Sequence, residues 1–188
     1  KDAYPRYESV VPQLLGAAGA RSALFTLSLI MLATLAFVEE WVKFAAARLG
    51  ITRSRYFDEP VDAMIYCVIA ALGFAAAENI GYILQNAEYA ISIAGFRFIT
   101  STLLHTLASA ILGYFFALSL IHTTRRVLLA SVGLALATVL HTLFNFLIIT
   151  LEQRAHAMLL IILLMIFSYF FVLYLFERIK KLSFARIS

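Results

Sequence analysis

The stretch AMLLIILLMIFSYFFVLYLF, residues 157–176, decides the fold class, because it runs its whole length without a charged side chain. An α-helix needs about 20 mostly apolar residues to cross the hydrocarbon core of a bilayer. The complete chain has the same character: of its 188 residues, 63% are hydrophobic and only 14% are charged. Its mean hydropathy is +0.91, and it is more apolar than a soluble domain of ordinary composition. The sequence therefore predicts a membrane protein with several spans.

Four other segments resemble this one, and together they predict five membrane-spanning helices. The expected ranges are 23–48, 61–84, 97–121, 127–150 and 156–177. All three prolines lie outside these interiors, and the intervening segments carry turn or charge signals, GITRSRYFDEP, QNAEYAISIAG, HTTRR and LEQR. We find no internal repeat, low-complexity tract or long linker. We expect an all-α fold, a polytopic transmembrane helical bundle of about five spans, which forms a single membrane-embedded domain over residues 1–188.

The basic residues indicate how this bundle sits in a membrane. A formal net charge of +4 could suggest a nucleic-acid partner, but ten of the fifteen Lys and Arg residues flank alternate loops, where the positive-inside rule places them. We therefore expect the lipid bilayer and no nucleic acid as a partner, with the amino terminus outside and the carboxyl terminus in the cytoplasm. The ten residues are Lys43, Arg48, Arg53, Arg55, Arg125, Arg126, Arg178, Lys180, Lys181 and Arg186.

The start of the chain and its cysteine exclude some features. The opening KDAYPRYESVVPQ is too polar for a signal peptide and lacks an initial Met, so we expect an upstream segment to be absent from this sequence. Cys67 is the only cysteine and lies in the second expected span. It excludes an internal disulfide and a multi-cysteine metal site, and we expect a packing residue.

Polar residues inside the spans are the informative ones, because each ionisable side chain costs about 2.5–3.5 kcal/mol at a helix centre. The first four spans each contain such residues, whereas the fifth contains none between His156 and Glu177. We therefore expect a four-helix catalytic core over residues 37–145, with residues 156–188 as a supporting fifth helix and a cytoplasmic tail. The polar set is Glu39, Glu40 and Lys43, then Glu78 and Asn79, then His105, then His141 and Asn145.

Depth and spacing predict that these residues meet. With a rise of about 1.5 Å per residue, the polar residues of the second, third and fourth spans lie roughly 10–13 Å from the outer ends of those spans. Glu39 fits the same layer less well, at roughly 16 Å, and its fit requires the first helix to continue through FAAARL and residues near Arg21 to project outside. Spacings of four also place polar residues on one helical face. On the second span, Gly73, Ala77 and Gly81 predict a ridge of small residues that a neighbouring backbone approaches closely.

A buried layer of carboxylates, imidazoles and a carboxamide is suited to hydrolysis. A desolvated carboxylate can take a proton from water, and imidazole and amide N–H groups can stabilise an oxyanion. A peptide bond is the expected target at this depth. The roles that we assign are general base for Glu39, orienting carboxylate near Lys43 for Glu40, water-holding partners for Glu78 and His105, oxyanion donors for His141 and Asn145, and helix–helix support for Asn79.

Four motifs, one on each of the first four spans, resemble those of a known family. They are EExxK (Glu39, Glu40, Lys43), FxxxEN (Phe74, Glu78, Asn79), an in-membrane histidine (His105) and HxxxN (His141, Asn145). Together they resemble the PrsW family of intramembrane proteases, which is similar to type II CAAX prenyl endopeptidases and bacteriocin-processing enzymes. Lys43 stands where the CAAX enzymes have an arginine one residue further on, and Glu78 where they have histidine. Both departures favour the PrsW branch and weaken any inference of a prenylated substrate.

The resemblance implies a function and a location. It implies an intramembrane endopeptidase of a bacterial cytoplasmic membrane, in which Glu39 or Glu40 activates water. The implied substrate is a membrane-spanning anti-sigma factor, cut near its extracytoplasmic side. We expect a metal-free mechanism without a cofactor. Zn²⁺ held by Glu78, His105 and His141 is the alternative, and no HExxH motif is present to decide between them.

Other readings of the same residues remain open. Glu39, Glu40 and Lys43 could form a structural ion pair near the cytoplasmic interface. A non-catalytic membrane scaffold subunit would keep the fold without needing the carboxylates. A proton-coupled transporter also uses intramembrane Glu and His, but five spans without an inverted repeat make it the weaker alternative.

Overall fold

The computed structural model describes residues 7–85, 88, 90–151 and 156–187, and these residues form long helices without a strand. The long helices are α1 (Tyr7–Arg53), α2 (Pro60–Gln85), α3 (Ala90–Ile121), α4 (Arg126–Leu151) and α5 (His156–Ile187), and a short 3₁₀ helix η2 (Thr123–Arg125) precedes α4. The prediction of an all-α bundle with five spans is confirmed, since each long helix contains a stretch apolar and long enough to cross a membrane. The opening KDAYPR and most of the LEQR break lie outside the described residues.

Helix boundaries differ from the expected ones at several places. The first helix begins at Tyr7 and not near residue 23, and the fifth ends at Ile187 and not near residue 177. The first helix does not end near Gly50 but continues to Arg53, where the backbone N–H of Ser54 donates to the carbonyl of Ile51 at 3.1 Å. The third helix begins at Ala90, well before the expected residue 97, because AISIAGF contains no proline and can propagate a helix. The continuous first helix meets the first of the two conditions under which Glu39 joins the polar layer, because it runs through FAAARL.

The start of α2 shows how local sequence sets a boundary. Pro60 occupies the first helical position, where its missing N–H costs nothing and its fixed φ suits a helix. The Asp62 carboxylate accepts hydrogen bonds from the backbone N–H groups of Asp58 and Glu59, at 3.2 and 2.9 Å. These contacts hold the connection from α1 in one conformation, and so fix where α2 enters the bundle.

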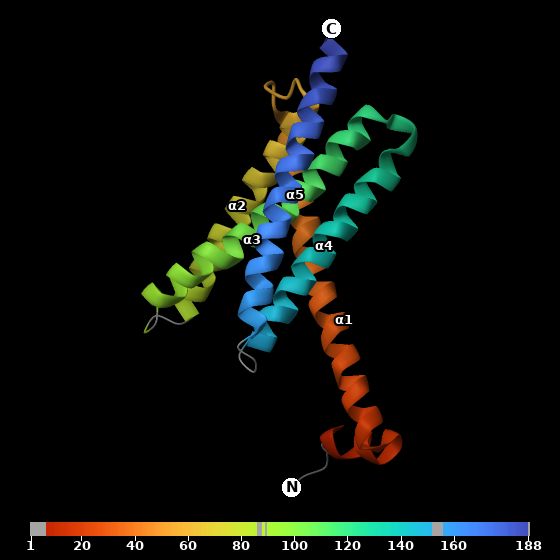
Figure 1. Ribbon diagram of the computed structural model, residues 1–188, viewed down its shortest axis with the longest axis vertical. Helices are drawn as coiled ribbons and strands as arrows, with labels where there is room; N and C mark the ends of the chain where they lie inside the picture. Colours follow the sequence, from red (N-terminus) through yellow and green to blue (C-terminus); the bar gives the residue numbers. More distant parts are fainter. Residues whose placement is uncertain (1–6, 86–87, 89, 152–155, 188) are drawn as a thin grey trace.

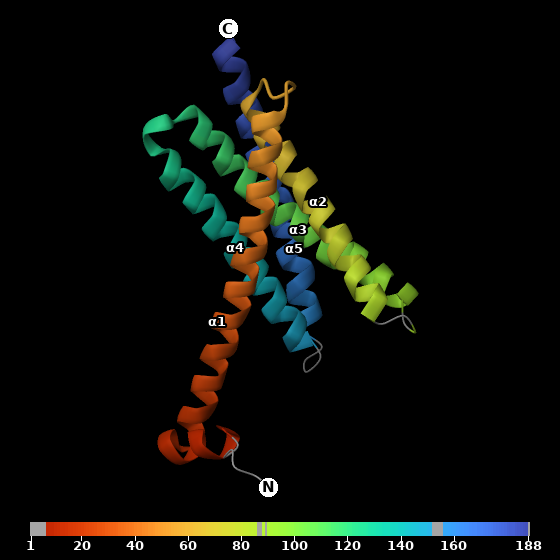
Figure 2. The ribbon, with the colours of Figure 1, turned by 180° about the vertical axis from the view of Figure 1, so that it is seen from behind.

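The helices alternate in direction, as Figures 1 and 2 show from opposite sides. The α1–α2 connection, η2 and the end of α5 lie at one end of the bundle, at the top of Figure 1. The start of α1 and the ends of α2 and α4 lie at the opposite end. Arg53, Arg125, Arg126 and Lys180 therefore belong to one end, as the charge pattern predicted. Lys43, which was counted with them, does not flank a loop, because it is buried beside Glu40 within α1.

The core of the bundle is built around α3. In the most apolar stretch of α3, 72% of the residues are buried, whereas in that of α1 only 6% are. One hydrophobic cluster joins residues of all five helices, including Ala47, Cys67, Leu112, Phe144 and Ile161. Cys67 is buried and unpaired, as expected of a packing residue. The third helix can therefore serve as the rigid reference against which the others are positioned.

The predicted small-residue ridge on α2 is wrong. A Cβ atom built at Gly73 or Gly81 would meet nothing within 4 Å, and Ala77 is exposed, so no helix among the described residues packs against this face. The close approach occurs elsewhere, because a Cβ at Gly113 of α3 would lie 2.6 Å from Met64 Cα and 3.1 Å from Cys67 Cβ. The packed face of α2 consists of small residues spaced by four and lies opposite the inferred ridge. The residues of this packed face are Ala63, Cys67, Ala71 and Ala75.

This contact gives a prediction about stability. Gly113→Ala is expected to lower the free energy of unfolding by about 1–3 kcal/mol, because a Cβ 2.6 Å from the Met64 backbone forces α2 and α3 apart. Gly73→Ala is the matched control on a helix face with open space, and it is expected to be neutral or stabilising. The midpoint of thermal unfolding in detergent measures both. Equal midpoints for the two variants would contradict the assigned α2–α3 contact.

Candidate active site

Residues of the four motifs converge on one cavity between α1, α2, α3 and α4. The cavity has a volume of about 310 Å³. No residue of α5 among those described lines it, in keeping with the supporting position expected for the fifth helix. The residues proposed from the sequence that line it are Glu39, Glu78, His105, His141 and Asn145.

Glu40 lies behind the cavity wall and is fully buried. Its Oε1 atom lies 2.8 Å from Nδ1 of His141 and 2.5 Å from Nζ of Lys43, and the Ser109 hydroxyl donates to Oε2 at 3.4 Å. A carboxylate at one imidazole nitrogen holds the proton there and leaves a lone pair on the other nitrogen. This is the position of an orienting carboxylate, and it turns Nε2 of His141 toward the cavity as an acceptor. With Nε2 accepting, His141 does not take the oxyanion-donor role that we assigned to it from the sequence.

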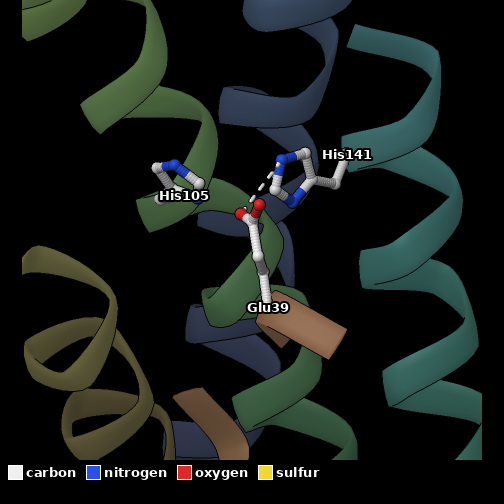
Figure 3. A group of neighbouring side chains, drawn as sticks. All are labelled: Glu39, His105 and His141. Atoms are coloured by element: carbon white, nitrogen blue, oxygen red, sulfur yellow. Dashed lines mark ion pairs between the residues drawn. The ribbon is translucent and has the colours of Figure 1, made fainter. Parts of the chain in front are cut away.

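Glu39 faces His141 from the cavity side. Figure 3 shows its carboxylate pointing from α1 to the imidazole on α4, and Oε2 lies 3.6 Å from Nε2. That oxygen is buried and has no hydrogen-bond partner among the described residues. Because both atoms are acceptors, the space between them requires a hydrogen-bond donor or a positive charge. A water molecule or a metal ion meets that requirement.

His105 is held at both ring nitrogens. Nδ1 lies 3.0 Å from Lys43 Nζ, and Nε2 lies 2.9 Å from Glu78 Oε2. Since a lysine ammonium only donates, Nδ1 accepts and the proton on Nε2 is donated to Glu78. Phe74 of the FxxxEN motif packs edge-on against His105, with ring centroids 5.4 Å apart. The motif therefore supplies both an acceptor and an apolar wall for this imidazole.

One group of described residues offers ligand atoms close enough together to hold a metal ion. Glu39, His105 and His141 each offer one ligand atom, and these atoms lie within 4.8 Å of one another. The zinc site that the sequence offered as the alternative contained Glu78 in place of Glu39. In the structure Glu78 Oε2 is engaged by His105 and Arg97, at 2.9 Å each. His105 differs from the other two, since its Nε2 becomes available only after it leaves Glu78.

Arg97 is a site residue that the sequence argument missed. It was not among the candidate residues, yet it lines the cavity and its guanidinium lies 2.9 Å from Glu78 Oε2. It also donates to Asn79 Oδ1 at 3.0 Å and to Ser101 Oγ at 3.2 Å. A signal was present, because Arg97, Ser101 and His105 are spaced by four and share one face of α3.

The two asparagines of the motifs have different surroundings. Asn79 donates to Thr102 Oγ1 at 3.1 Å and accepts from Arg97, so it links α2 to α3 as expected of a helix–helix contact. It does not line the cavity. Asn145 lies on the cavity wall one turn after His141, where its amide can reach a bound group.

The buried ion pair gives a second prediction about stability. Lys43→Met is expected to cost about 3–5 kcal/mol, because it leaves the Glu40 carboxylate uncompensated inside the bundle. Lys180→Met is a matched control: Lys180 and Glu177 have the same spacing of three residues but are exposed, so the expected cost is at most about 1 kcal/mol. Thermal unfolding in detergent measures both. Equal losses would contradict a buried pair.

Comparison with known proteins identifies relatives of this chain. It is 31% identical over 124 residues to the Protease PrsW of Geobacillus kaustophilus, covering 65% of this chain and 53% of the relative. It is 31% identical over 115 residues to the Protease PrsW of Oceanobacillus iheyensis, covering 61% and 52%. For the Protease PrsW of Bacillus subtilis the identity is 26% over 124 residues, covering 65% and 56%. The chain spans about half the length of these curated relatives. No solved structure matches it significantly.

A family profile covers much more of the chain. The profile described as "PrsW family intramembrane metalloprotease" matches residues 8–175. The matched range includes all four motifs, the cavity that they line and most of α5. The resemblance inferred from the motifs is therefore confirmed, and the chain belongs to the PrsW family of intramembrane metalloproteases.

Proposed function

We propose that this chain is an intramembrane endopeptidase that hydrolyses a peptide bond in or near the transmembrane segment of a single-span protein. The observation that carries the proposal is the pair Glu39 Oε2 and His141 Nε2, two acceptors 3.6 Å apart on the wall of a cavity between four membrane helices. A water molecule between them donates one hydrogen bond to each atom. Its oxygen lone pairs then remain free for a carbonyl carbon.

The proposed reaction uses Glu39 as the general base. Its carboxylate takes a proton from the water as the water oxygen attacks the peptide carbonyl carbon. The Asn145 amide and the Arg97 guanidinium, on the same cavity wall, donate hydrogen bonds to the developing oxyanion. The C–N bond then breaks, and the proton on Glu39 passes to the leaving nitrogen. Glu40 keeps the ring of His141 in one orientation throughout.

The family's description implies a metal ion, and the chemistry of the donor set fits one. Glu39 offers a carboxylate oxygen and His141 an imidazole nitrogen, which are ligands that zinc accepts. Glu40 behind His141 is the kind of carboxylate that orients a metal-binding histidine. His105 would complete a set of three. When bound, a divalent ion would acidify a water molecule and polarise the scissile carbonyl.

The substrate and the orientation are further parts of the proposal. The resemblance implies a membrane-spanning anti-sigma factor, cut near its extracytoplasmic side as the first cleavage. The cavity is compatible with such a substrate, because apolar side chains such as Leu35 and Ile149 on its wall are half exposed and would face lipid. We place the basic end of the bundle in the cytoplasm of a bacterium. The bundle would act as one catalytic unit.

Cleavage of a defined substrate tests the proposal. The full chain, purified in detergent, is incubated with single-span test proteins based on anti-sigma factors, and mass spectrometry locates any cut. We expect a cut in or beside the span. We expect its loss in Glu78→Gln, with helix content unchanged by circular dichroism, because the Glu78 carboxylate holds Arg97 and His105 in place. A folded, unmutated protein that cuts none of these substrates would favour a non-catalytic scaffold.

A further inference from the structure

A second cavity lies at the basic end of the bundle, between α1, α3 and α4. It has a volume of about 380 Å³. A groove along α1 shares Trp41, Phe44 and Arg48 with it and extends it to Thr52. None of its lining residues belongs to the candidate active site. The lining residues that matter below are Trp41, Phe44, Arg48, Phe116, Arg126 and Leu134.

Two arginines from different helices face this cavity. Arg48 comes from α1 and Arg126 from α4, and both are exposed. Within the described part of the chain neither forms an ion pair, and no acidic residue lines the cavity. α4 begins at Arg126, so the positive end of its helix dipole lies here as well. The cavity therefore carries positive charge that the described residues do not neutralise.

The depth of the arginines corresponds to lipid headgroups. Arg48 lies five residues before the end of the span Ser22–Arg53, and Arg126 lies three residues after the start of the span Thr123–Ile149. At about 1.5 Å per residue, both lie within about 8 Å of the end of the bundle. Trp41 and Phe44 lie further along α1 toward the bilayer centre, where they offer an apolar wall.

We propose that this cavity binds one anionic glycerophospholipid, with its phosphate between Arg48 and Arg126 and an acyl chain along Trp41 and Phe44. Guanidinium groups match phosphate oxygens in geometry and charge, and they do so more strongly than a point charge. Basic pockets between membrane helices are suited to anionic headgroups. A zwitterionic headgroup would bring its own ammonium against two arginines, so the site discriminates by net charge.

The sole tryptophan of the chain makes a direct test possible. Trp41 lines the cavity, so a lipid with brominated acyl chains quenches its fluorescence when the lipid occupies the site. The full chain in phosphatidylcholine nanodiscs is compared at increasing fractions of brominated phosphatidylglycerol or brominated phosphatidylcholine. We expect the anionic lipid to reach half-maximal quenching at a mole fraction on the order of tenfold lower.

Matched double variants separate the site from general surface charge. Arg48→Gln with Arg126→Gln is expected to abolish the tenfold preference. Arg53→Gln with Arg125→Gln removes the same charge from neighbouring positions at this end that do not line the cavity, and it is expected to retain the preference. Arg48→Lys with Arg126→Lys keeps the charge and is expected to retain most of the preference. Circular dichroism confirms that each protein is folded.

Three outcomes would overturn the proposal. Equal quenching by both brominated lipids would remove the headgroup preference. Loss of the preference in the Arg53 and Arg125 double variant would assign it to overall charge. Relief of the quenching by millimolar glycerol 3-phosphate would assign the site to a soluble phosphate monoester, whereas persistence of quenching supports a lipid.

Discussion

Glu39→Gln is expected to slow cleavage of a single-span substrate by about 10²–10⁴-fold, because an amide cannot take a proton from water. The same change is expected to leave the midpoint of thermal unfolding unchanged or raise it. The glutamine amide can donate to Nε2 of His141, whereas the native oxygen at 3.6 Å faces that acceptor without a hydrogen bond. Loss of activity with retained or higher stability is the signature of a residue kept for chemistry.

The control for this experiment is Glu177→Gln. Glu177 is exposed on α5 and pairs with Lys180 at 3.5 Å, far from the cavity lining, so neither cleavage nor unfolding is expected to change. Single-turnover cleavage rates and thermal unfolding in the same detergent give both readouts. A Glu39→Gln protein that cleaves at the unmutated rate refutes the general base. One that unfolds several degrees earlier shows that Glu39 is structural.

Metal removal is the second change with a large expected effect. In the metal-dependent form of the reaction that the family's description implies, Glu39 and His141 would hold the ion in place of the water molecule proposed between them. Active protein would then contain about one equivalent of zinc by elemental analysis, and chelation would remove it together with cleavage. Restoring zinc is expected to restore cleavage. His141→Asn is expected to purify with little zinc, because it loses the Nε2 atom that faces Glu39. Glu40→Gln is expected to bind zinc about 10–100-fold more weakly, since it no longer orients His141 as an anion.

Two other histidines provide the control for metal content. His122 and His156 are exposed at helix ends and do not line the cavity of the candidate site. His122→Asn and His156→Asn are therefore expected to retain both zinc and cleavage. Full cleavage by thoroughly chelated protein that contains no metal would refute the metal-dependent mechanism. It would leave Glu39 and His141 as the groups that activate water by themselves.

Much of the fold follows from the sequence because membrane helices are dictated by length and hydropathy. A segment such as residues 157–176 has one stable state in a bilayer, so five spans and their alternating directions could be predicted. Boundaries were harder. Gly50 does not end the first helix, which continues to Arg53. The third helix begins at Ala90, inside the break QNAEYAISIAG, because its backbone hydrogen bonds can propagate there.

The main error about packing concerned which face of α2 contacts its neighbouring helix. Gly73, Ala77 and Gly81 and the true contact face of α2 both have spacings of four, so periodicity cannot choose between them. The choice depends on Gly113 of α3, which admits the backbone at Met64. That complementarity depends on the sequences of both helices, so the sequence of α2 alone could not predict it.

For the candidate site, residue types and shared depth predicted which side chains gather at the cavity. They did not predict the connections between those side chains. Lys43 bridges Glu40 and His105, and Arg97 braces Glu78, because the rotamers of these long side chains depend on neighbours from other helices. Those connections also engage Glu78 Oε2, so the described residues whose ligand atoms lie close enough to hold a metal ion include Glu39 and not Glu78.

The adjacent carboxylates of EExxK look like a duplicated function, and the helix shows that they are not interchangeable. Consecutive residues of an α-helix point about 100° apart. Glu39 therefore lines the cavity between the helices. Glu40 is instead buried in contact with Lys43, His141 and Ser109. Neither carboxylate could take over when the other is lost. Each carboxylate is therefore required individually, although the sequence alone suggests two equivalent groups.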